Sequence, residues 1–181
     1  MSEGFGSMRH LGGRLVGSLW PGGPPAEGER WARSWLLPGE VRLWQRLSGP
    51  DRRHALGVAR EVSRRLSIDD RDVAGRAIMA AALLHDVGKI DAGMGTWSRV
   101  AVTAVAVGVG RGRVAGWAGP GRRWRARAGR YVTHDRLGGG LLEAAGSDPF
   151  TIAWACEHHR PVERRSVDPA VGAVLEAADG D

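Results

Sequence analysis

The stretch Ala77-Ile78-Met79-Ala80-Ala81-Ala82-Leu83-Leu84-His85-Asp86-Val87-Gly88-Lys89 decides how this chain of 181 residues is interpreted. Its first eight residues are apolar and free of glycine and proline, which predicts a buried helix. A histidine and an aspartate then stand side by side, and Gly88 lets the chain leave the helix there. An imidazole and a carboxylate at one helix end can turn toward the same metal ion.

Upstream of this stretch, the sequence predicts two further helices. Pro38 can open one at its first turn. Asp51 is a plausible N-cap of the next, in which apolar residues recur at intervals of three and four. Asp69 or Asp70 would then start the helix that ends in His85-Asp86.

Downstream, three more helix starts can be assigned. Thr133 precedes a helix that begins at His134 and stops at Gly146. The pairs Asp148-Pro149 and Asp168-Pro169 each place a capping side chain before a proline at the first helical position. No alternating strand-like runs joined by a hairpin turn occur in the sequence. The predicted fold class is therefore all-α, a single bundle of about six or seven helices.

Composition sets the expected domain organisation and compartment. Residues 1–29 are rich in glycine and proline and are expected to form a flexible N-terminal segment, so that 30–181 make up the helical domain. The single cysteine, Cys156, excludes an internal disulfide and fits a reducing cytoplasm. The longest apolar stretch, 100–110, is too short to span a bilayer, so no membrane association is expected.

Lysine usage singles out one position. The chain has 26 basic residues, of which only Lys89 is a lysine, and its formal net charge is +6. A strong arginine bias is typical of a GC-rich genome. One lysine beside His85-Asp86 therefore suggests a place where a compact ammonium group is needed in place of a planar guanidinium.

Other histidines and a late aspartate complete a recognisable pattern. His54 lies upstream of His85-Asp86. Downstream follow, in this order, His134, the pair His158-His159 and Asp179. Over roughly residues 38–181 the chain thereby resembles the HD-domain superfamily of metal-dependent phosphohydrolases. The additional histidines resemble the HD-GYP branch, which hydrolyses cyclic dinucleotides. The Gly-Tyr-Pro element itself is absent, so the resemblance does not extend to that specificity.

The resemblance implies a set of metal ligands. His54, His85, Asp86 and Asp179 would form a first site, and Asp86 would bridge to a second ion held by His134 together with His158, His159 or both. Adjacent helical residues point about 100° apart, which leaves open which histidine of the pair coordinates. Mixed imidazole and carboxylate ligands suit one or two divalent ions of Mn, Fe, Co, Zn or Mg. Two such ions can clamp a phosphoryl group and activate a water molecule, with Asp86 and Lys89 as catalytic residues.

The arginine-rich segment 111–130 has three interpretations. It can be a solvated surface loop, a mobile flap over an anionic substrate, or a nucleic-acid-binding surface that uses arginine and tryptophan. Nucleic acid is the least favoured of these. Arg130 and Lys89 are the candidates for binding substrate phosphate.

The sequence thus predicts a cytoplasmic, metal-dependent phosphohydrolase of the HD superfamily. Its substrate would be a nucleotide or a related small phosphate ester, and both phosphomonoesterase and phosphodiesterase activity stay open, as does the oligomeric state. A first alternative is a catalytically silent HD domain that binds metal or nucleotide and signals through a partner. A second, less favoured one is a nucleic-acid-binding module that uses segment 111–130.

Overall fold

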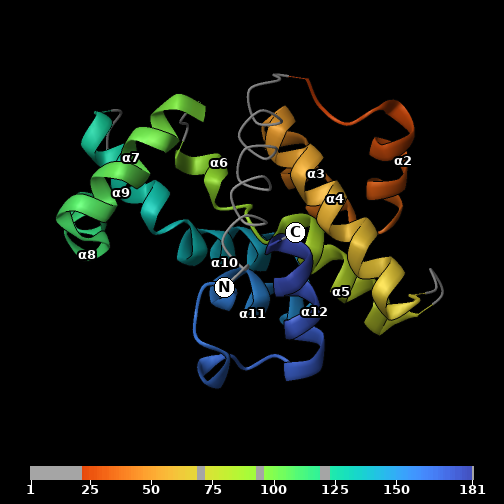
Figure 1. The fold of residues 1–181 in the computed structure, drawn as a ribbon. Coiled ribbons are helices and arrows are strands. Elements are labelled where there is room, and N and C mark those ends of the chain that lie inside the picture. Colours follow the sequence, from red (N-terminus) through yellow and green to blue (C-terminus); the bar gives the residue numbers. More distant parts are fainter. Residues whose placement is uncertain (1–21, 69–71, 93–95, 119–122, 181) are drawn as a thin grey trace, which may run out of the picture.

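The structure is a computed structural model that describes residues 22–68, 72–92, 96–118 and 123–180. These residues form helices and connecting loops, with no strand among them, which confirms the all-α class (Figure 1). They form more helices than the six or seven expected, because several short helices link the long ones. The helices are α2 (Ala26–Ser34), α3 (Pro38–Arg46), α4 (Gly49–Leu66), α5 (Val73–Leu84), α6 (Lys89–Ala92), α7 (Thr96–Val109), α8 (Arg111–Ala115), α9 (Trp124–Val132), α10 (His134–Ala145), α11 (Pro149–Glu157), the 3-10 helix η1 (Val162–Arg164) and α12 (Pro169–Gly180).

Two of the predicted helix starts are wrong. Helix α4 begins at Gly49, and the hydroxyl of its N-cap Ser48 accepts a hydrogen bond from the Asp51 backbone N–H. Because proline is tolerated in a first helical turn, Pro50 does not delay the helix to Asp51. Helix α5 is capped by Asp72, whose side chain accepts from the Ala74 N–H, rather than by Asp69 or Asp70, which lie outside the described residues.

Helix α2 begins before residue 30, where the helical domain was expected to start. Residues 1–21 lie outside the described part of the chain, but 26–29 belong to α2 rather than to a flexible segment. Glu29 ties this helix to its neighbours, because it accepts a hydrogen bond from Trp44 Nε1 at 2.7 Å and pairs with Arg52 at 3.1 Å. Ala32, at the inner face of α2, is fully buried.

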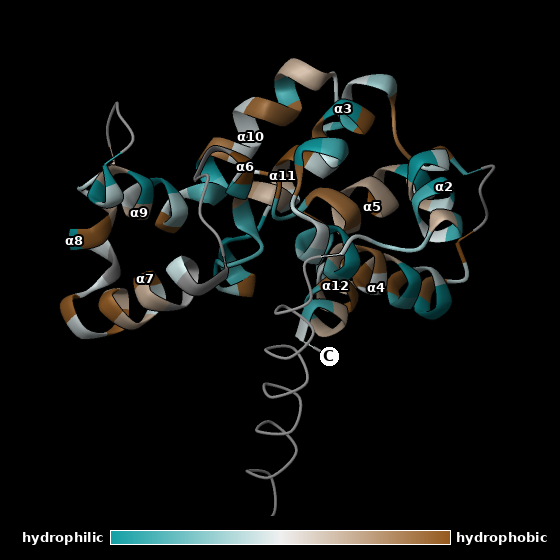
Figure 2. Cartoon of the chain, turned by 90° about the horizontal axis from the view of Figure 1, so that it is seen from above, coloured by the Kyte–Doolittle hydropathy of each residue, from teal (hydrophilic) through white to brown (hydrophobic). Residues whose placement is uncertain are grey.

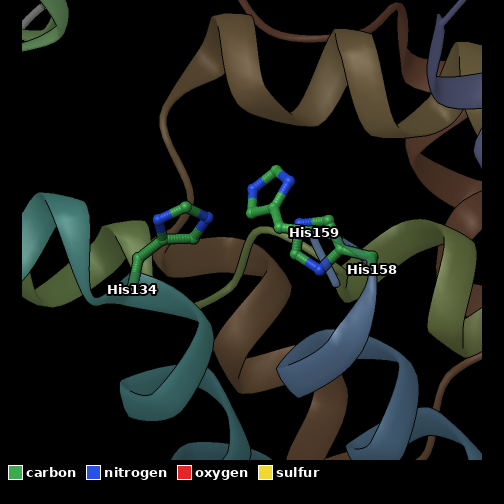
Figure 3. Close-up of side chains that lie close together, drawn as sticks. All are labelled: His134, His158 and His159. Atoms are coloured by element: carbon green, nitrogen blue, oxygen red, sulfur yellow. The ribbon is translucent and has the colours of Figure 1, made fainter. Parts of the chain in front are cut away.

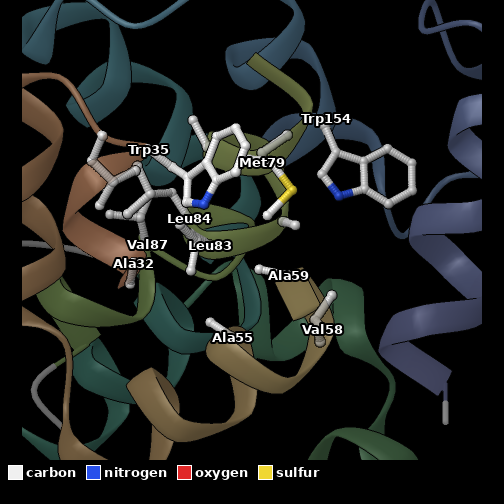
Figure 4. Close-up of a cluster of buried hydrophobic side chains, with 14 of the residues drawn as sticks. Ala32, Trp35, Ala55, Val58, Ala59, Met79, Leu83, Leu84, Val87 and Trp154 are labelled. Carbon is white, nitrogen blue, oxygen red and sulfur yellow. The ribbon is translucent and has the colours of Figure 1, made fainter. Parts of the chain in front are cut away.

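Helix α5 forms the centre of the main core. Its residues from Met79 to Leu84 are buried all round, as the unbroken apolar run predicts. Helices α3, α4 and α11 pack against it, and α12 packs against α4 on the outer side (Figures 1 and 4). Trp44 and Trp154 fill the space between the helices and are almost completely buried. This packing brings the end of α5 into the middle of the molecule.

A second, smaller core lies within helices α7, α8 and α9, here called the α7–α9 lobe. Val102, Val114 and Ala128, one from each helix, are fully buried against one another. The lobe stands beside the main bundle and joins it through α6 and α10 (Figure 2). The described residues of segment 111–130 form α8 and most of α9 around this core, where a loop was one of the expectations.

Gly88 was expected to end α5 through its backbone conformation, but the structure shows a different reason for a glycine at this position. Among the described glycines only Gly110 and Gly146 have a positive φ, so Gly88 does not end the helix through a left-handed conformation. A Cβ at Gly88 would instead lie 1.8 Å from the carbonyl oxygen of His134. The glycine is needed because two backbone segments cross there. This contact places the start of α10 directly beside the end of α5. None of the helices in the described residues is long and apolar enough to cross a membrane.

Candidate metal centre

The structure brings all the predicted ligands together, and almost all of them come from helix ends. His85 is the C-cap residue of α5 and Asp86 lies in the turn after it. His134 is the first residue of α10. His158 and His159 end α11, and Asp179 lies in the last turn of α12. His54 is the exception, because it lies in the second turn of α4.

Two groups of side chains have a geometry that could hold a metal ion. The first consists of His54, His85 and Asp179, and the second of His134, His158 and His159 (Figure 3). Within each group the ligand atoms lie within 4.8 Å of one another. Both members of the His158-His159 pair belong to the second group, so the structure does not single out one of them.

Asp86 lies between the two groups. Its Oδ2 is 3.4 Å from His85 Nε2, and its Oδ1 is 3.2 Å from His134 Nε2. The two oxygens of this one carboxylate therefore face one group each. The groups also approach each other directly, because the His85 and His158 rings are 5.4 Å apart between centroids. Asp86 therefore lies where one carboxylate could contact a cation in each group.

Backbone carbonyls orient three of the imidazole rings. In His85 the Nδ1–H donates to Ala82 O at 3.0 Å, and in His134 it donates to Tyr131 O at 2.8 Å. His158 Nδ1 makes the same kind of contact with the last turn of α11. Each ring therefore presents Nε2 toward the centre. Such hydrogen bonds from the outer nitrogen are typical of histidines that bind metal.

Buried nitrogen atoms without partners support a metal site. His158 Nε2 is inaccessible to solvent and makes no hydrogen bond. His134 Nε2 is equally inaccessible, and although Asp86 Oδ1 lies 3.2 Å away, the two atoms form no hydrogen bond. Burying a polar atom without a partner costs on the order of 1–3 kcal/mol. Two such atoms in one group of histidines fit a divalent cation that imidazole binds well. The C-terminal ends of α5 and α11 also point here, and their partial negative charge favours a cation.

The charges of the site explain its shifted pKa values. Burial alone would lower the pKa of His85, but the Asp86 carboxylate reverses this and raises it to about 9. Burial would raise the pKa of Asp86, but Lys89 and His85 hold it well below its ordinary value. His158 lacks such a carboxylate partner, so burial and the nearby His85 lower its pKa to about 3. Its imidazole is therefore neutral at pH 7 and ready to bind metal.

Asp179 belongs to the same network. Its Oδ1 lies 2.8 Å from His54 Nε2 and 3.6 Å from His85 Nε2. Burial acts to raise its pKa, but the hydrogen bond from His54 and the charge of His85 bring it below its ordinary value. Leu175 and Ala178, both buried, anchor the last turns of α12 beneath it. The carboxylate is thus ionised and held in place.

Lys89 contacts the site from the first residue of α6. Its Nζ donates to Asp86 Oδ2, and the side chain is largely buried, with 18% exposed. Burial would lower its pKa, but the Asp86 carboxylate raises it above the ordinary value. The ammonium group is therefore charged at the point where Asp86 faces His85. Arg130 is half-buried on α9, four residues before His134 in the sequence.

Sequence reasoning missed Tyr131. Its ring stacks on His134, with centroids 6.0 Å apart and 27° between the planes, and its carbonyl orients that histidine. Its electrostatic effect also reaches Lys89. Tyr131 is the only tyrosine in the chain and lies three residues before His134, which was the one available signal.

Comparison of the chain with protein-family models, with curated proteins and with solved structures gives no match. The resemblance to the HD-domain superfamily thus rests on the motif residues, and it stays a prediction.

Proposed function

We propose that this protein is a metal-dependent phosphohydrolase that acts on a phosphate ester, with the two groups of histidines holding one or two divalent ions. The observation that carries the proposal is the position of Asp86, whose two oxygens face one group each. A carboxylate between two cation sites is the arrangement that places two metal ions a few ångströms apart. The HD resemblance of the same residues supports the same function.

The choice of phosphate chemistry follows from the donor set and the surrounding charge. When bound, such ions supply Lewis-acid polarisation of a phosphoryl group and make a water molecule more acidic. Lys89 adds a fixed positive charge within the site. An anionic substrate fits this charge better than a neutral one.

The exposure of the candidate ligands indicates the side from which a substrate would reach the site. His85, Asp86, His134 and His158 are buried, whereas His159 is exposed and His54 and Asp179 are partly exposed. The buried residues exclude water and fix the ligand geometry. A phosphate ester would therefore approach from the side of the exposed residues.

Metal loading followed by a phosphatase assay tests this function. The protein is purified without chelators, its metal content is measured by elemental analysis, and aliquots are loaded with Mn, Fe, Co, Zn or Mg. We expect hydrolysis of bis(p-nitrophenyl) phosphate or p-nitrophenyl phosphate that stops on chelation and returns with metal. Stoichiometric metal without hydrolysis of any nucleotide or ester would identify the silent binding module instead.

A further inference from the structure

Helix α9 carries arginine and aromatic side chains along one side, next to the face that packs into the lobe's core. The inner face is formed by small and apolar residues, among them the buried Ala128 and Val132. Trp124, Arg127 and Tyr131 follow one another at spacings of three and four residues, so they lie along one side of the helix. Arg130 lies one turn from Arg127 on the same side. Two arginines thus lie between an exposed tryptophan and Tyr131, which is partly buried against the edge of the lobe's core.

The aromatic side chains mark the two ends of this face. At the outer end, Trp124 is 44% exposed and its ring lies 6.2 Å from that of Trp117. Arg125 lies over the Trp117 ring at 4.9 Å. At the inner end, Tyr131 stacks on His134, which belongs to the second group of ligands. The face thus leads from an exposed tryptophan to the metal centre.

The charge of the molecule is concentrated around the same helix. Between Asp91 and Asp135 the sequence contains eight arginines and no carboxylate. The whole chain has a net charge of +6, so the residues outside this segment carry a net charge of −2. Such a separation of charge attracts a polyanion to the lobe and not to the rest of the surface.

We propose that α9 binds single-stranded nucleic acid and guides one of its phosphodiester groups to the metal centre. This inference rests on the proposed phosphohydrolase function and names its substrate class. Arginine supplies contacts to the phosphates, and the exposed Trp124 ring supplies a surface on which a base stacks. An isolated nucleotide would reach only the inner end of this face, and a polyphosphate chain has no bases to use its aromatic rings. The inference reverses the low rank that sequence reasoning gave to nucleic acid.

The length of the face sets the size of the ligand. From Arg123, the N-cap residue of α9, to His134 is eleven residues, or about 16 Å at the helical rise. A single strand with a rise of about 3.4 Å per nucleotide covers this distance with roughly five nucleotides. Contacts to about three phosphates give a slope of about −2 for log affinity against log salt.

Binding is tested by fluorescence anisotropy with labelled ten-residue oligothymidine and oligouridine. Chelator is present throughout, so neither metal nor turnover enters the measurement. We expect binding that weakens with salt at the stated slope and is stronger than binding of the same strand as a duplex. The double variant Arg127→Ala/Arg130→Ala should weaken binding by on the order of tenfold or more and reduce the salt slope by about 1.4. The variant Arg33→Ala/Arg42→Ala, which removes two exposed arginines from α2 and α3, is the matched control and should bind as the wild type.

A second pair of variants tests the stacking contact. Trp124→Ala should weaken binding on the order of tenfold, and Trp124→Phe should restore most of it, which a loss of folding would not explain. Equal effects of the α9 variant and the Arg33/Arg42 control would overturn the proposal. So would equal competition by linear polyphosphate of the same charge together with unchanged binding by Trp124→Ala.

The two proposals fail separately. Hydrolysis of a small phosphate ester without oligonucleotide binding would overturn the role of α9 and leave the phosphohydrolase in place. Oligonucleotide binding in a protein that hydrolyses no ester after metal loading would overturn the catalytic function and support α9 as a binding surface.

Discussion

Asp86 Oδ1 lies 3.2 Å from His134 Nε2, although the two residues are 48 positions apart and belong to different helix ends. This contact joins the two groups of ligands. We therefore expect Asp86→Asn to lower metal affinity at both, by on the order of a hundredfold or more, because even residues behind the ligands change affinity by 10–100-fold. His134→Ala should spare metal at His54, His85 and Asp179 while lowering the rate.

Metal content per chain, measured after dialysis against limiting metal, checks this prediction. Asp135→Asn is the matched control, because it makes the same charge change one residue beyond His134 and its carboxylate contacts the Arg136 N–H. Wild-type metal content in Asp86→Asn would show that the carboxylate is not a ligand.

Lys89→Arg tests the single lysine. A guanidinium group is larger and planar, so it does not fit where the compact ammonium contacts Asp86. We expect a rate at least tenfold lower with metal content unchanged. Steady-state kinetics on the metal-loaded protein measure this. Full activity in Lys89→Arg would mean that the lysine is an accident of composition.

Gly88→Ala tests the crossing of the two backbones. Its Cβ would meet the His134 carbonyl at 1.8 Å, and backbone atoms cannot move away as a flexible side chain can. We expect a loss of about 3 kcal/mol or more in the free energy of unfolding, together with loss of metal from the second group. In α10, Gly140→Ala is the control, because its Cβ meets nothing within 4 Å and alanine should stabilise the helix by up to about 1 kcal/mol. Equal stability of the two variants in urea denaturation would contradict this role of Gly88.

Metal binding should depend on pH through His85. In the metal-free protein its pKa is raised to about 9, so at pH 7 the imidazole is protonated and a metal ion must displace the proton. Metal affinity should therefore increase as the pH rises from 7 toward 9. The metal-free fold behaves in the opposite way, because a raised pKa stabilises it fully below about pH 6.5 and this contribution is lost as the pH passes 9.

Calorimetric titration in buffers of different ionisation enthalpy measures the released proton, about one per His85 at pH 7. The difference in melting temperature between metal-loaded and chelated protein should grow over the same pH range. Metal binding at pH 7 without proton release would contradict the assignment of His85 as a ligand.

Hydrogen exchange of α12 tests the last ligand. Asp179 lies in the final turn of its helix, where fraying is expected, and its contacts with His54 and His85 restrain it. We expect slower exchange of residues 170–180 with metal than with chelator. Equal protection in both states, together with unchanged metal content in Asp179→Asn, would remove Asp179 from the site.

The sequence predicted where the candidate ligands lie in the fold better than it predicted the elements between them. His85 and Asp86 could be placed because the unbroken apolar run before them predicts a buried helix that ends there. His158 and Asp179 could be placed because a proline marks the start of α11 and of α12, and each residue lies about one helix length further along. The cap of α5 was misplaced because several aspartates precede it and only packing selects Asp72. The small core of the α7–α9 lobe was missed because segment 111–130 has the composition of a loop, and its Val114 and Ala128 become buried only where three helices meet.

The placement of His134 makes the two halves of the metal centre mechanically unequal. His54, His85 and Asp179 are carried by helices of the main bundle, whereas His134 follows α9 with only Thr133 between them. A displacement of the lobe would therefore move His134 before it moves His54 or Asp179. Because His134 Nε2 lies 3.2 Å from Asp86 Oδ1, the carboxylate between the two groups would be the next to feel that movement.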